Sequence, residues 1–390
     1  MTPLTKQRHR LYVAATTIVW LLAMVSVSGQ AQPESKPQLA EDVFKSVQVL
    51  RGIPVSQFME TMGFFSASLG LNCTSCHGEE SGGDWASYAD DRPARKQITR
   101  RMVLMVNTIN QANFQGRQVV TCYSCHRGSI RPQVIPNLAV QYGEPLAEEP
   151  DEILAQAQRV PPANQILDKY LQALGGLPRL QSVTSLVATG TRRDFDDLIE
   201  KYPVEIHARA TGQHATVVHS RNGDRSTIFD GRAGWAAAPL DEVPVPVLPL
   251  TGGDLDGARI DAELFFPARI KEAFTQWRVG FPAIVDDREV HLVQGTSAGG
   301  NPVKFYFDME SGLLTRVLRY TRLPVGRTPT QIDYADYREV GGVKVPFRTV
   351  VTWTDGRSLL ELTDVRLNVP IDSTRFTRPP VPVPAPPPAR

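Results

Sequence analysis

The sequence predicts an α+β protein in which a helical N-terminal part precedes a curved antiparallel β-sheet that holds a helix. Apolar residues recur at helical spacing between residues 42 and 109. After residue 185 the pattern changes to short strands separated by hairpin turns. Residues 146–162 lie between the two parts, and their prolines and acidic side chains are typical of an exposed connector.

The first 31 residues are expected to be a secretory signal peptide. Lys6, Arg8 and Arg10 precede an apolar run from Leu11 to Val27, and small residues lead up to Ala31. Cleavage after Ala31 would place the mature protein in the periplasm or another extracytoplasmic compartment. The alternative is an uncleaved membrane anchor, because a run of about 17 apolar residues is near the lower limit for spanning a bilayer.

The helical part is expected to span residues 32–145. Apolar residues in Asp42–Leu50 predict a short first helix, and Ser56 is the predicted N-cap of a second. Gly70 is expected to end this second helix. Its apolar face consists of Phe58, Met62, Phe65 and Leu69.

A third helix is predicted with Asp90 or Asp91 as its N-cap and Pro93 early in the helix. Its apolar face consists of Ile98, Met102, Met105, Val106 and Ile109. A cysteine motif follows each of these two longer helices, so one helix-and-motif unit occurs twice.

The two motifs are Cys73-Thr-Ser-Cys76-His77 and Cys122-Tyr-Ser-Cys125-His126, and they use all four cysteines of the chain. C-x-x-C-H is the signature of covalent c-type haem attachment. Two thiols one helical turn apart form thioether bonds with the haem vinyl groups, and the next residue becomes the proximal ligand of the iron. We therefore expect two covalently bound haems c, with His77 and His126 as proximal ligands.

Three other readings of the cysteines compete with haem. Zinc sites with paired C-x-x-C have about 15–20 residues between the pairs, whereas residues 77–121 separate Cys76 from Cys122 here. A thioredoxin-like redox pair would need a βαβ unit, and none surrounds either motif. Structural disulfides would leave the two histidines unexplained.

The sixth iron ligand is expected to be methionine. Between residues 33 and 150 the only histidines are His77 and His126, so no second histidine is available in this part. The soft ligands present are Met59, Met62, Met102 and Met105. Met62 lies in the centre of its apolar face and is preferred to Met59, whereas both Met102 and Met105 lie on theirs. The alternative is that these methionines only fill the core.

Several runs in residues 40–140 resemble the cytochrome c subunit of photosynthetic reaction centres. They are Phe58-x-x-x-Met62, the two motifs, Arg100-Arg101-Met102, Ile109-Asn110 and Val120–Gly128. In that family a methionine on a helix upstream of each motif supplies the sixth ligand, which implies Met62 and Met102 here. The resemblance also implies a carrier that passes single electrons between redox proteins or to a membrane electron-transfer complex. Filled axial positions argue against a substrate-transforming enzyme, and the alternative is a haem enzyme with an open iron.

The chain departs from the family pattern in two respects. The family member binds four haems, whereas this chain has two motifs and resembles one half. The family's histidine before the second motif has no counterpart between Asn113 and Val119.

Basic residues near the motifs are candidates to neutralise haem propionates; the alternative is an exposed helix face. They are Arg95, Lys96, Arg100, Arg101 and Arg127. The formal net charge of +1 and the lack of a basic tract argue against a nucleic-acid partner.

The sheet part is expected to span residues 163–377, and it begins with a helix that starts at Ala163 and stops at Gly175. The predicted strands are 186–191, 204–210, 215–219, 225–229, one that follows Gly234, 289–295, 303–308, 313–321, 331–340, 344–353 and 358–368. A loop over 239–257 and a helical or irregular piece over 258–277 are predicted between them. Residues 378–390 are expected to form a proline-rich tail without a core.

The runs Phe229–Trp235 and Asp336–Phe347 resemble the periplasmic lipoprotein-carrier fold. That resemblance implies an open half-barrel with a helix against its concave face. It opens an alternative function, a lipid- or quinone-binding carrier in which the haem part is a redox sensor or electron donor. The sheet part would otherwise be a scaffold that presents the haem part to a partner. The remaining histidines of this part are interpreted as ordinary surface or core residues: His207, His214, His219 and His291.

Overall fold

The computed structural model describes residues 37–78, 87–136, 138, 152–194, 200–239, 243 and 245–381. The predicted signal peptide, most of residues 137–151 and the end of the proline-rich tail lie outside these residues. In the part that is described, no helix has the length and apolar character needed to cross a membrane.

The N-terminal part of the chain is helical, as predicted. Its elements are α2 (Ala40–Val43), α3 (Val55–Leu69), α4 (Cys73–His77), the 3-10 turn η2 (Ser87–Ala89), α5 (Ala94–Phe114) and α6 (Cys122–His126). Helix α3 ends at Gly70, whose φ of 65° is in the left-handed region that glycine adopts readily.

Two local predictions about these helices are wrong. The first helix stops at Val43 because the chain turns at Ser46, which has a φ of 63°, and residue 39 pairs with Pro54. The N-caps of α3 and α5 are Pro54 and Pro93, and neither has a side-chain cap. The carboxylate of Asp91 instead binds basic side chains of α5.

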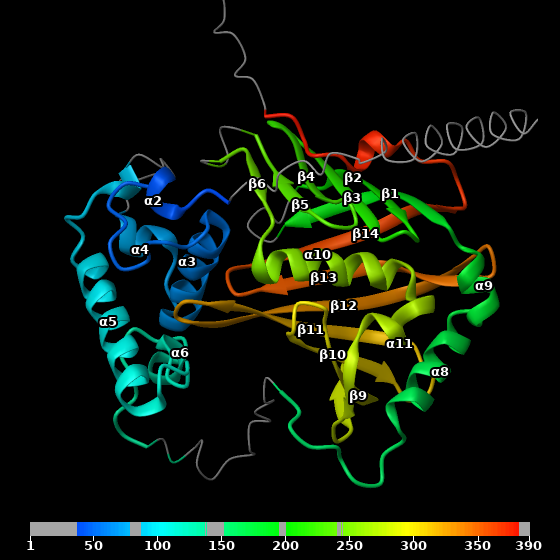
Figure 1. Ribbon diagram of the computed structural model, residues 1–390, viewed down its shortest axis with the longest axis horizontal. Helices are drawn as coiled ribbons and strands as arrows, with labels where there is room; N and C mark the ends of the chain where they lie inside the picture. Colours follow the sequence, from blue (N-terminus) through cyan, green and yellow to red (C-terminus); the bar gives the residue numbers. More distant parts are fainter. Residues whose placement is uncertain are drawn as a thin grey trace, which may run out of the picture. The chain divides into compact units, whose positions relative to one another are not determined.

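The motif helices pack in a crossed arrangement. Helix α6 packs against α3, and α4 packs against α5, so each motif contacts the long helix that precedes the other motif (Figure 1). Helix α5 also contacts α6. At the end of α3 the backbone N–H of Gly128 donates to the carbonyl of Ser68 over 2.9 Å. A Cβ at Gly70 would lie 2.3 Å from the Gly128 carbonyl oxygen, so glycine permits this close contact.

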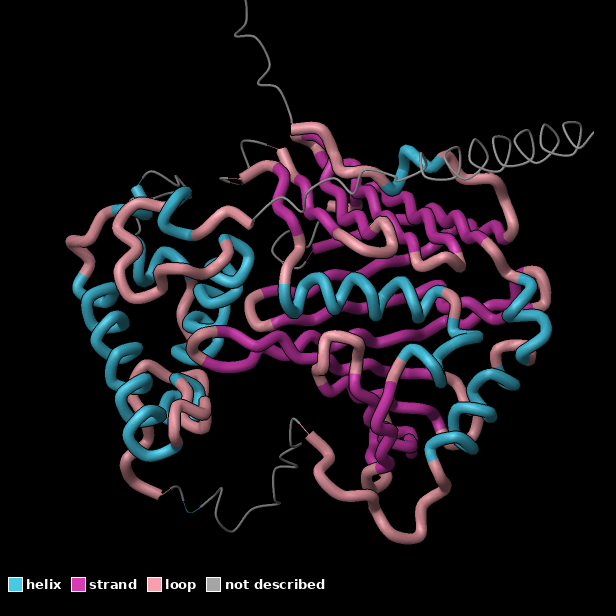
Figure 2. Tube along the Cα trace, in the orientation of Figure 1, coloured by secondary structure: helices cyan, strands magenta, loops and turns pink. Residues whose placement is uncertain are grey.

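The C-terminal part contains one large antiparallel sheet. Its strands are β1 (Ser185–Asp194), β2 (Tyr202–Arg209), β3 (Gln213–Ser220), β4 (Gly223–Phe229), β5 (Gly234–Ala237), β6 (Val247–Pro249), β7 (Thr275–Val279), β8 (Ala283–Val285), β9 (Arg288–Thr296), β10 (Pro302–Asp308), β11 (Leu314–Leu323), β12 (Gly326–Val340), β13 (Val343–Trp353) and β14 (Gly356–Leu367). The strand order is β6-β5-β4-β3-β2-β1-β14-β13-β12-β11-β10-β9-β7, with β8 beside β9. Figure 2 shows the strands of this sheet in magenta. The sheet is curved and does not close, which confirms the α+β fold class.

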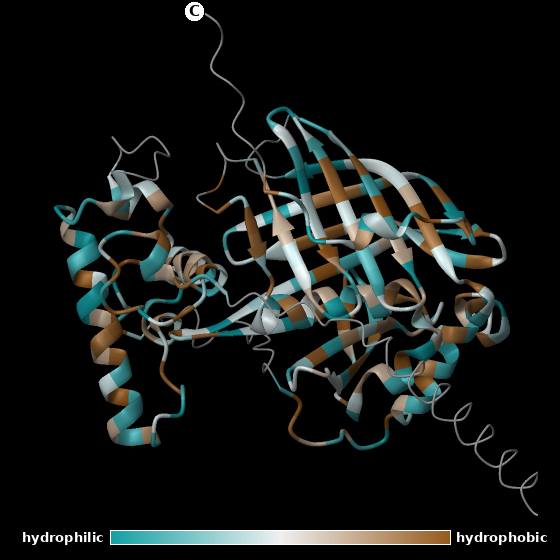
Figure 3. Cartoon of the chain, turned by 45° about the horizontal axis from the view of Figure 1, so that its top comes forward, coloured by the Kyte–Doolittle hydropathy of each residue, from teal (hydrophilic) through white to brown (hydrophobic). Residues whose placement is uncertain are grey.

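Helices cover one face of this sheet. They are α8 (Ala163–Ala173), α9 (Leu177–Ser182), α10 (Gly252–Phe265), η3 (Pro267–Arg269) and α11 (Ile270–Ala273). The C-terminal turn η4 (Ser373–Phe376) packs through Phe376 against Ala215 and Ile228, which point to the other face. The largest apolar cluster joins Leu167 and Tyr170 of α8 to Phe305 and Phe307 of β10 and to Ile260 of α10. Figure 3 shows the alternation of apolar and polar residues along the strands that produces this buried face.

Helix α10 begins earlier than predicted. The sequence interpretation placed Gly252 in a loop, but the helix starts there and ends at Phe265. Glycine is needed inside this helix because it lies close against β11: a Cβ at Gly253 would meet the Thr321 side chain at 2.5 Å. The strands β6, β7 and β8 were also not predicted.

The end of the predicted connector packs along β7. The backbone N–H of Ala157 donates to the carbonyl of Val279 over 2.9 Å. The N–H of Ile153 donates to Gln294 Oε1 over 2.6 Å, and the Ile153 side chain is buried. Residues 153–157 are therefore attached to the sheet part.

Candidate functional site

Each C-x-x-C-H motif forms a single helical turn with a side-chain cap. Asn72 Oδ1 accepts a hydrogen bond from the backbone N–H of Ser75 over 3.0 Å. Thr121 Oγ1 accepts one from the N–H of Ser124 over 3.3 Å. These caps fix the start of each turn, so the two cysteines of a motif, three residues apart, lie on one side of it.

The four cysteine thiols are free of disulfide bonds. Burial raises the pKa of the Cys76 thiol and of the Cys122 thiol. Within the residues that the structure describes, no group of three or more His, Cys, Asp or Glu is arranged to hold a metal ion.

The ring of His77 is held by η2. Its Nδ1 lies 3.2 Å from the carbonyl oxygen of Tyr88, and the two rings are 4.6 Å apart. Because a carbonyl oxygen only accepts, Nδ1 carries the proton and Nε2 keeps its lone pair for a metal. Burial lowers the pKa of His77, which favours the neutral imidazole that binds iron.

The ring of His126 is oriented by the same kind of contact. Its Nδ1 lies 3.0 Å from the carbonyl oxygen of Ser129, in the turn that follows α6. Nε2 is again left as the ligand atom. Both motif histidines are therefore oriented by a backbone carbonyl that accepts from Nδ1. The carbonyl belongs to η2 at His77 and to the turn after α6 at His126.

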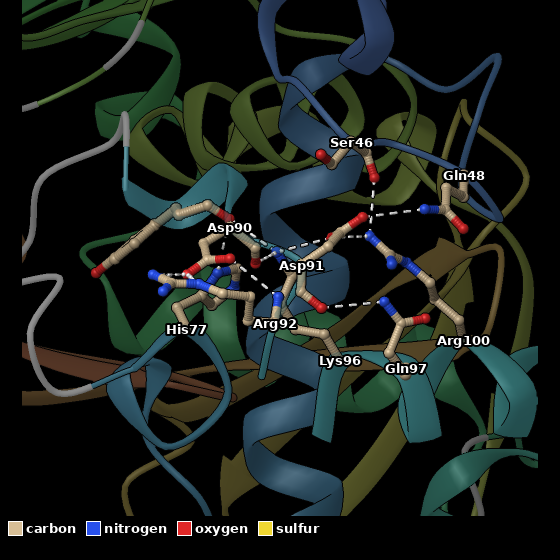
Figure 4. A network of polar contacts seen from close by, with 10 residues as sticks. Ser46, Gln48, His77, Asp90, Asp91, Arg92, Lys96, Gln97 and Arg100 are labelled. Atoms are coloured by element: carbon tan, nitrogen blue, oxygen red, sulfur yellow. Dashed lines mark hydrogen bonds and ion pairs between the residues drawn. The ribbon is translucent and has the colours of Figure 1, made fainter. Parts of the chain in front are cut away.

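A polar network fixes the segment that holds His77 (Figure 4). Lys96 Nζ donates to the Tyr88 carbonyl over 2.9 Å. The Asp91 carboxylate accepts from Arg100 over 2.6 Å and lies 3.4 Å from Lys96 Nζ. The hydrogen bond from Arg100 is the main cause that lowers the pKa of Asp91. This network joins η2 and residues 90–91 to helix α5.

The predicted propionate partners divide into two groups. Lys96, Arg100 and Arg95 donate to protein oxygens, and the acceptor for Arg95 is the Ser75 carbonyl at 2.8 Å. Arg101 and Arg127 have exposed side chains. The Nη1 atom of Arg100 is buried and has no hydrogen-bond acceptor among the described residues, so it offers a donor to a propionate.

A cavity lies beside the second motif. Its walls come from α3, α5 and α6: Phe65, Leu69, Thr99, Met105, Val106, Thr121, Cys122, Cys125 and His126. It measures about 370 Å³, including space open to solvent. His126 and helix α5 thus border one apolar space, as the proximal and distal sides of a haem site would.

Helix α5 presents two methionines near this cavity. Met105 lines it and is 44% exposed. Met102 follows the lining residue Thr99 by three positions and precedes the lining residue Val106 by four, so it lies on the same helix face. The structure therefore keeps both candidates near His126.

Met62 lies in a different environment from the one expected. It is half-buried and packs against the apolar cluster that contains Phe64, Val103 and Cys122. The cluster against which Met62 packs includes a residue of the second motif, because α3 packs against α6. Sequence reasoning missed this crossed packing, which brings Phe65 and Leu69 of α3 into the second cavity. No local sequence pattern indicates the packing of α3 against α6.

Asn110 is a second residue whose role the sequence did not show. Its side chain is buried; Oδ1 accepts from the backbone N–H groups of Val119 and Val120 over 3.1 and 2.9 Å. Its Nδ2 donates to the Val120 carbonyl over 2.7 Å. Asn110 therefore fixes the segment that leads into Cys122. The residues present fit haem c at both motifs: paired thiols, oriented imidazoles and, at the second, an apolar cavity.

Comparison with protein families agrees with this site. Residues 15–162 match the family described as photosynthetic reaction centre cytochrome C subunit. The predicted resemblance of the helical part to that family is confirmed.

Among curated proteins, the similar ones are photosynthetic reaction center cytochrome c subunits. The subunit of Roseobacter denitrificans is 34% identical over 110 residues, which cover 26% of this chain and 29% of that protein. The subunit of Rubrivivax gelatinosus is 27% identical over 198 residues, which cover 47% of this chain and 51% of that protein. The chain thus spans about half or less of the length of these relatives.

Solved structures are similar to the sheet part. A LolA superfamily protein from Nitrosomonas europaea aligns with a TM-score of 0.39 and 14% identity, over 56% of this chain and 98% of that chain. A putative outer membrane lipoprotein-sorting protein domain from Vibrio parahaemolyticus aligns with a TM-score of 0.39 and 12% identity, over 54% and 97%. This likeness concerns the fold of the sheet part alone.

Proposed function

We propose that the protein is an exported dihaem c-type cytochrome that carries single electrons between redox partners. The observation that carries this proposal is the matched pair of histidines. His77 and His126 each follow a C-x-x-C turn, and each binds a backbone carbonyl through Nδ1, with Nε2 left as the ligand atom. The match of residues 15–162 to the reaction-centre cytochrome family supports the same conclusion.

The residues of each site have distinct tasks in this proposal. Cys73, Cys76, Cys122 and Cys125 form the thioether bonds, and His77 and His126 bind the two irons. Met62 and Met102 are the proposed distal ligands, as the resemblance implies; the cavity lining makes Met105 the competitor of Met102. Haem c with histidine and methionine ligands supplies one-electron transfer at a comparatively high potential.

Filled axial positions favour electron transfer over substrate chemistry, so we propose a carrier and not an enzyme. The partners would be extracytoplasmic redox proteins or a membrane electron-transfer complex. We propose residues 32–145 as the cytochrome domain and 163–377 as the sheet domain, with 146–162 between them.

A lipid or quinone carrier is the weaker alternative. The face of the sheet under the helices is filled by the chain's own side chains: Leu167, Tyr170 and Ile260 pack against Phe305 and Phe307, and all five are buried. This packing favours the electron carrier.

The test is a potentiometric titration of the full chain, produced with the haem-attachment machinery. We expect two one-electron components and no rapid binding of CO to the reduced protein or of cyanide to the oxidised protein. Rapid binding of either ligand would indicate an open iron and would contradict the carrier in favour of a haem enzyme.

A further inference from the structure

The hairpin between β11 and β12 ends in an apolar turn. The last pair of the ladder is Leu323 with Gly326, so Pro324 and Val325 form the connection. Two-residue hairpin turns usually carry Asn, Asp or Gly, because the favoured turn types require positive φ angles. We call residues 323–326 the hairpin tip. They lie where β11 and β12 extend to helix α3 of the helical part (Figure 1).

The hairpin tip is buried among the helices that carry the motifs. Leu323 is 3% exposed and Val325 is 2% exposed. Both belong to the cluster formed with Phe64 of α3, Val103 of α5 and Cys122 of α6. The sheet part thus contributes two side chains to the core of the helical part.

Two further contacts fix the position of the hairpin tip. Gln118 Nε2 donates to the carbonyl of Leu323 over 3.0 Å, from the segment that leads into the second motif. A Cβ at Gly326 would lie 2.3 Å from the ring of Phe64, so α3 and β12 touch at this point. The hairpin tip is therefore attached both to the segment that precedes α6 and to helix α3.

The cluster around the hairpin tip borders the cavity of the second motif. Cys122 belongs to the cluster and also lines the cavity. Phe65 packs against the cluster and lines the same cavity. The apolar side chains of the hairpin tip therefore lie behind the wall of the second site.

We propose that the β11–β12 hairpin is a positioning element of the second haem site, and that it raises the reduction potential of that haem by holding α3, α5 and α6 together around a dry wall. This inference rests on the proposed function. Water near the site favours the oxidised form, which carries the additional positive charge, so a dry wall raises the potential. The sheet part thereby has a role in electron transfer although it carries no motif.

The experiment compares Leu323→Ala with Leu314→Ala in the full dihaem chain. Both leucines are in β11 and both are buried, at 3% and 2% exposure, but Leu314 lies in the cluster of the sheet part. The second haem is identified as the redox component that is lost in a Cys122→Ala/Cys125→Ala variant.

We expect Leu323→Ala to lower the equilibrium constant for reduction of the second haem about tenfold, which is about 59 mV for one electron. Leu314→Ala should lower the melting temperature and leave both potentials unchanged. Leu323→Met, which keeps the volume, should restore the potential.

A second variant covers the case in which Leu323→Ala does not fold. Gly326→Ala pushes on the Phe64 ring without removing any side chain, and it should also lower the potential of the second haem. Unchanged potentials in a folded, dihaem Leu323→Ala or Gly326→Ala variant would overturn the inference. Absence of haem from the wild-type chain would instead overturn the proposed function.

Discussion

A single backbone carbonyl selects the tautomer of each motif histidine. Metal-binding histidines are commonly oriented by a carboxylate or a carbonyl. Here Tyr88 and Ser129 supply carbonyls. A neutral carbonyl adds no charge beside the imidazole, so we expect it to lower the potential of a bound iron less than a carboxylate partner would.

The distal ligand of the second iron can be assigned with two substitutions. We expect Met102→Ala to lower the potential of one haem and to remove the far-red absorption of sulfur-bound ferric iron at that site. Met105→Ala should leave the potential and the far-red absorption unchanged, because Met105 is 44% exposed and would only line the cavity. The reverse result would assign Met105 as the ligand and correct the resemblance.

The Asp91 carboxylate gives the helical part a pH dependence at low pH. Its pKa is lowered from the ordinary value of 3.8, mainly by the hydrogen bond from Arg100. A lowered folded pKa means a stabilisation that is present above 3.8 and is lost as the pH falls through the folded value. Chemical denaturation should therefore show that Asp91→Asn is less stable than wild type at pH 6 and that the difference shrinks on acidification. A difference independent of pH would contradict this account.

Helix α5 connects the two sites through its two ends. Its first turn holds η2 through Lys96, and Asn110 near its C-terminus holds the segment before Cys122. Helix α5 contacts both motif helices, and α3 packs against α6 of the second motif. The two proposed haems are thus held by one structural unit.

Asn110→Ala tests the connection between helix α5 and the segment before Cys122. The substitution removes three hydrogen bonds from a buried side chain, so we expect a loss of about 2–3 kcal/mol in the free energy of unfolding. Asn113→Ala is the matched control on the same helix; its exposed side chain bonds only the Ile109 carbonyl, and its effect should stay within about 0.5 kcal/mol. Thermal unfolding followed by circular dichroism measures both, and equal effects would argue against the role of Asn110.

The longer strands and the motif residues could be predicted from the sequence because their signals are local. Alternating residues and a glycine turn define β13 and β14, and the spacing of cysteine and histidine defines α4 and α6. The early start of α10 was not predicted, because Gly253 was interpreted as a turn residue, whereas it permits close packing against Thr321. The crossed packing of α3 on α6 and the insertion of Leu323 are contacts between residues distant in sequence, which no local pattern specifies.

The whole chain is organised around α3, which faces the motifs on one side and the sheet part on the other. Ser56 Oγ lies 3.5 Å from Thr251 Oγ1, and Phe64 meets Gly326. Glu60 is buried near Asp254 and Asp355, and burial with these carboxylates raises its pKa to about 9. The sheet part is therefore in direct contact with the helix that carries Met62.

Gly63 is another point of close approach in this contact. A Cβ there would lie 2.6 Å from Asp355 Oδ2, so Gly63→Ala should cost about 1–3 kcal/mol of stability through overpacking. In an Asp355→Ala background the same change should be neutral or stabilising, because alanine favours helix over glycine by about 1 kcal/mol. A double-mutant cycle of unfolding free energies checks this, and additive effects would show that the two residues do not meet.

The central claim is that this chain binds two haems through its two C-x-x-C-H motifs, and haem stoichiometry tests it most directly. The full chain, produced with the haem-attachment machinery, is assayed by pyridine haemochrome absorbance against protein concentration. We predict two haems c per chain, and one in the Cys122→Ala/Cys125→Ala variant. Colourless protein with four titratable thiols, two cystines or bound zinc would contradict the account.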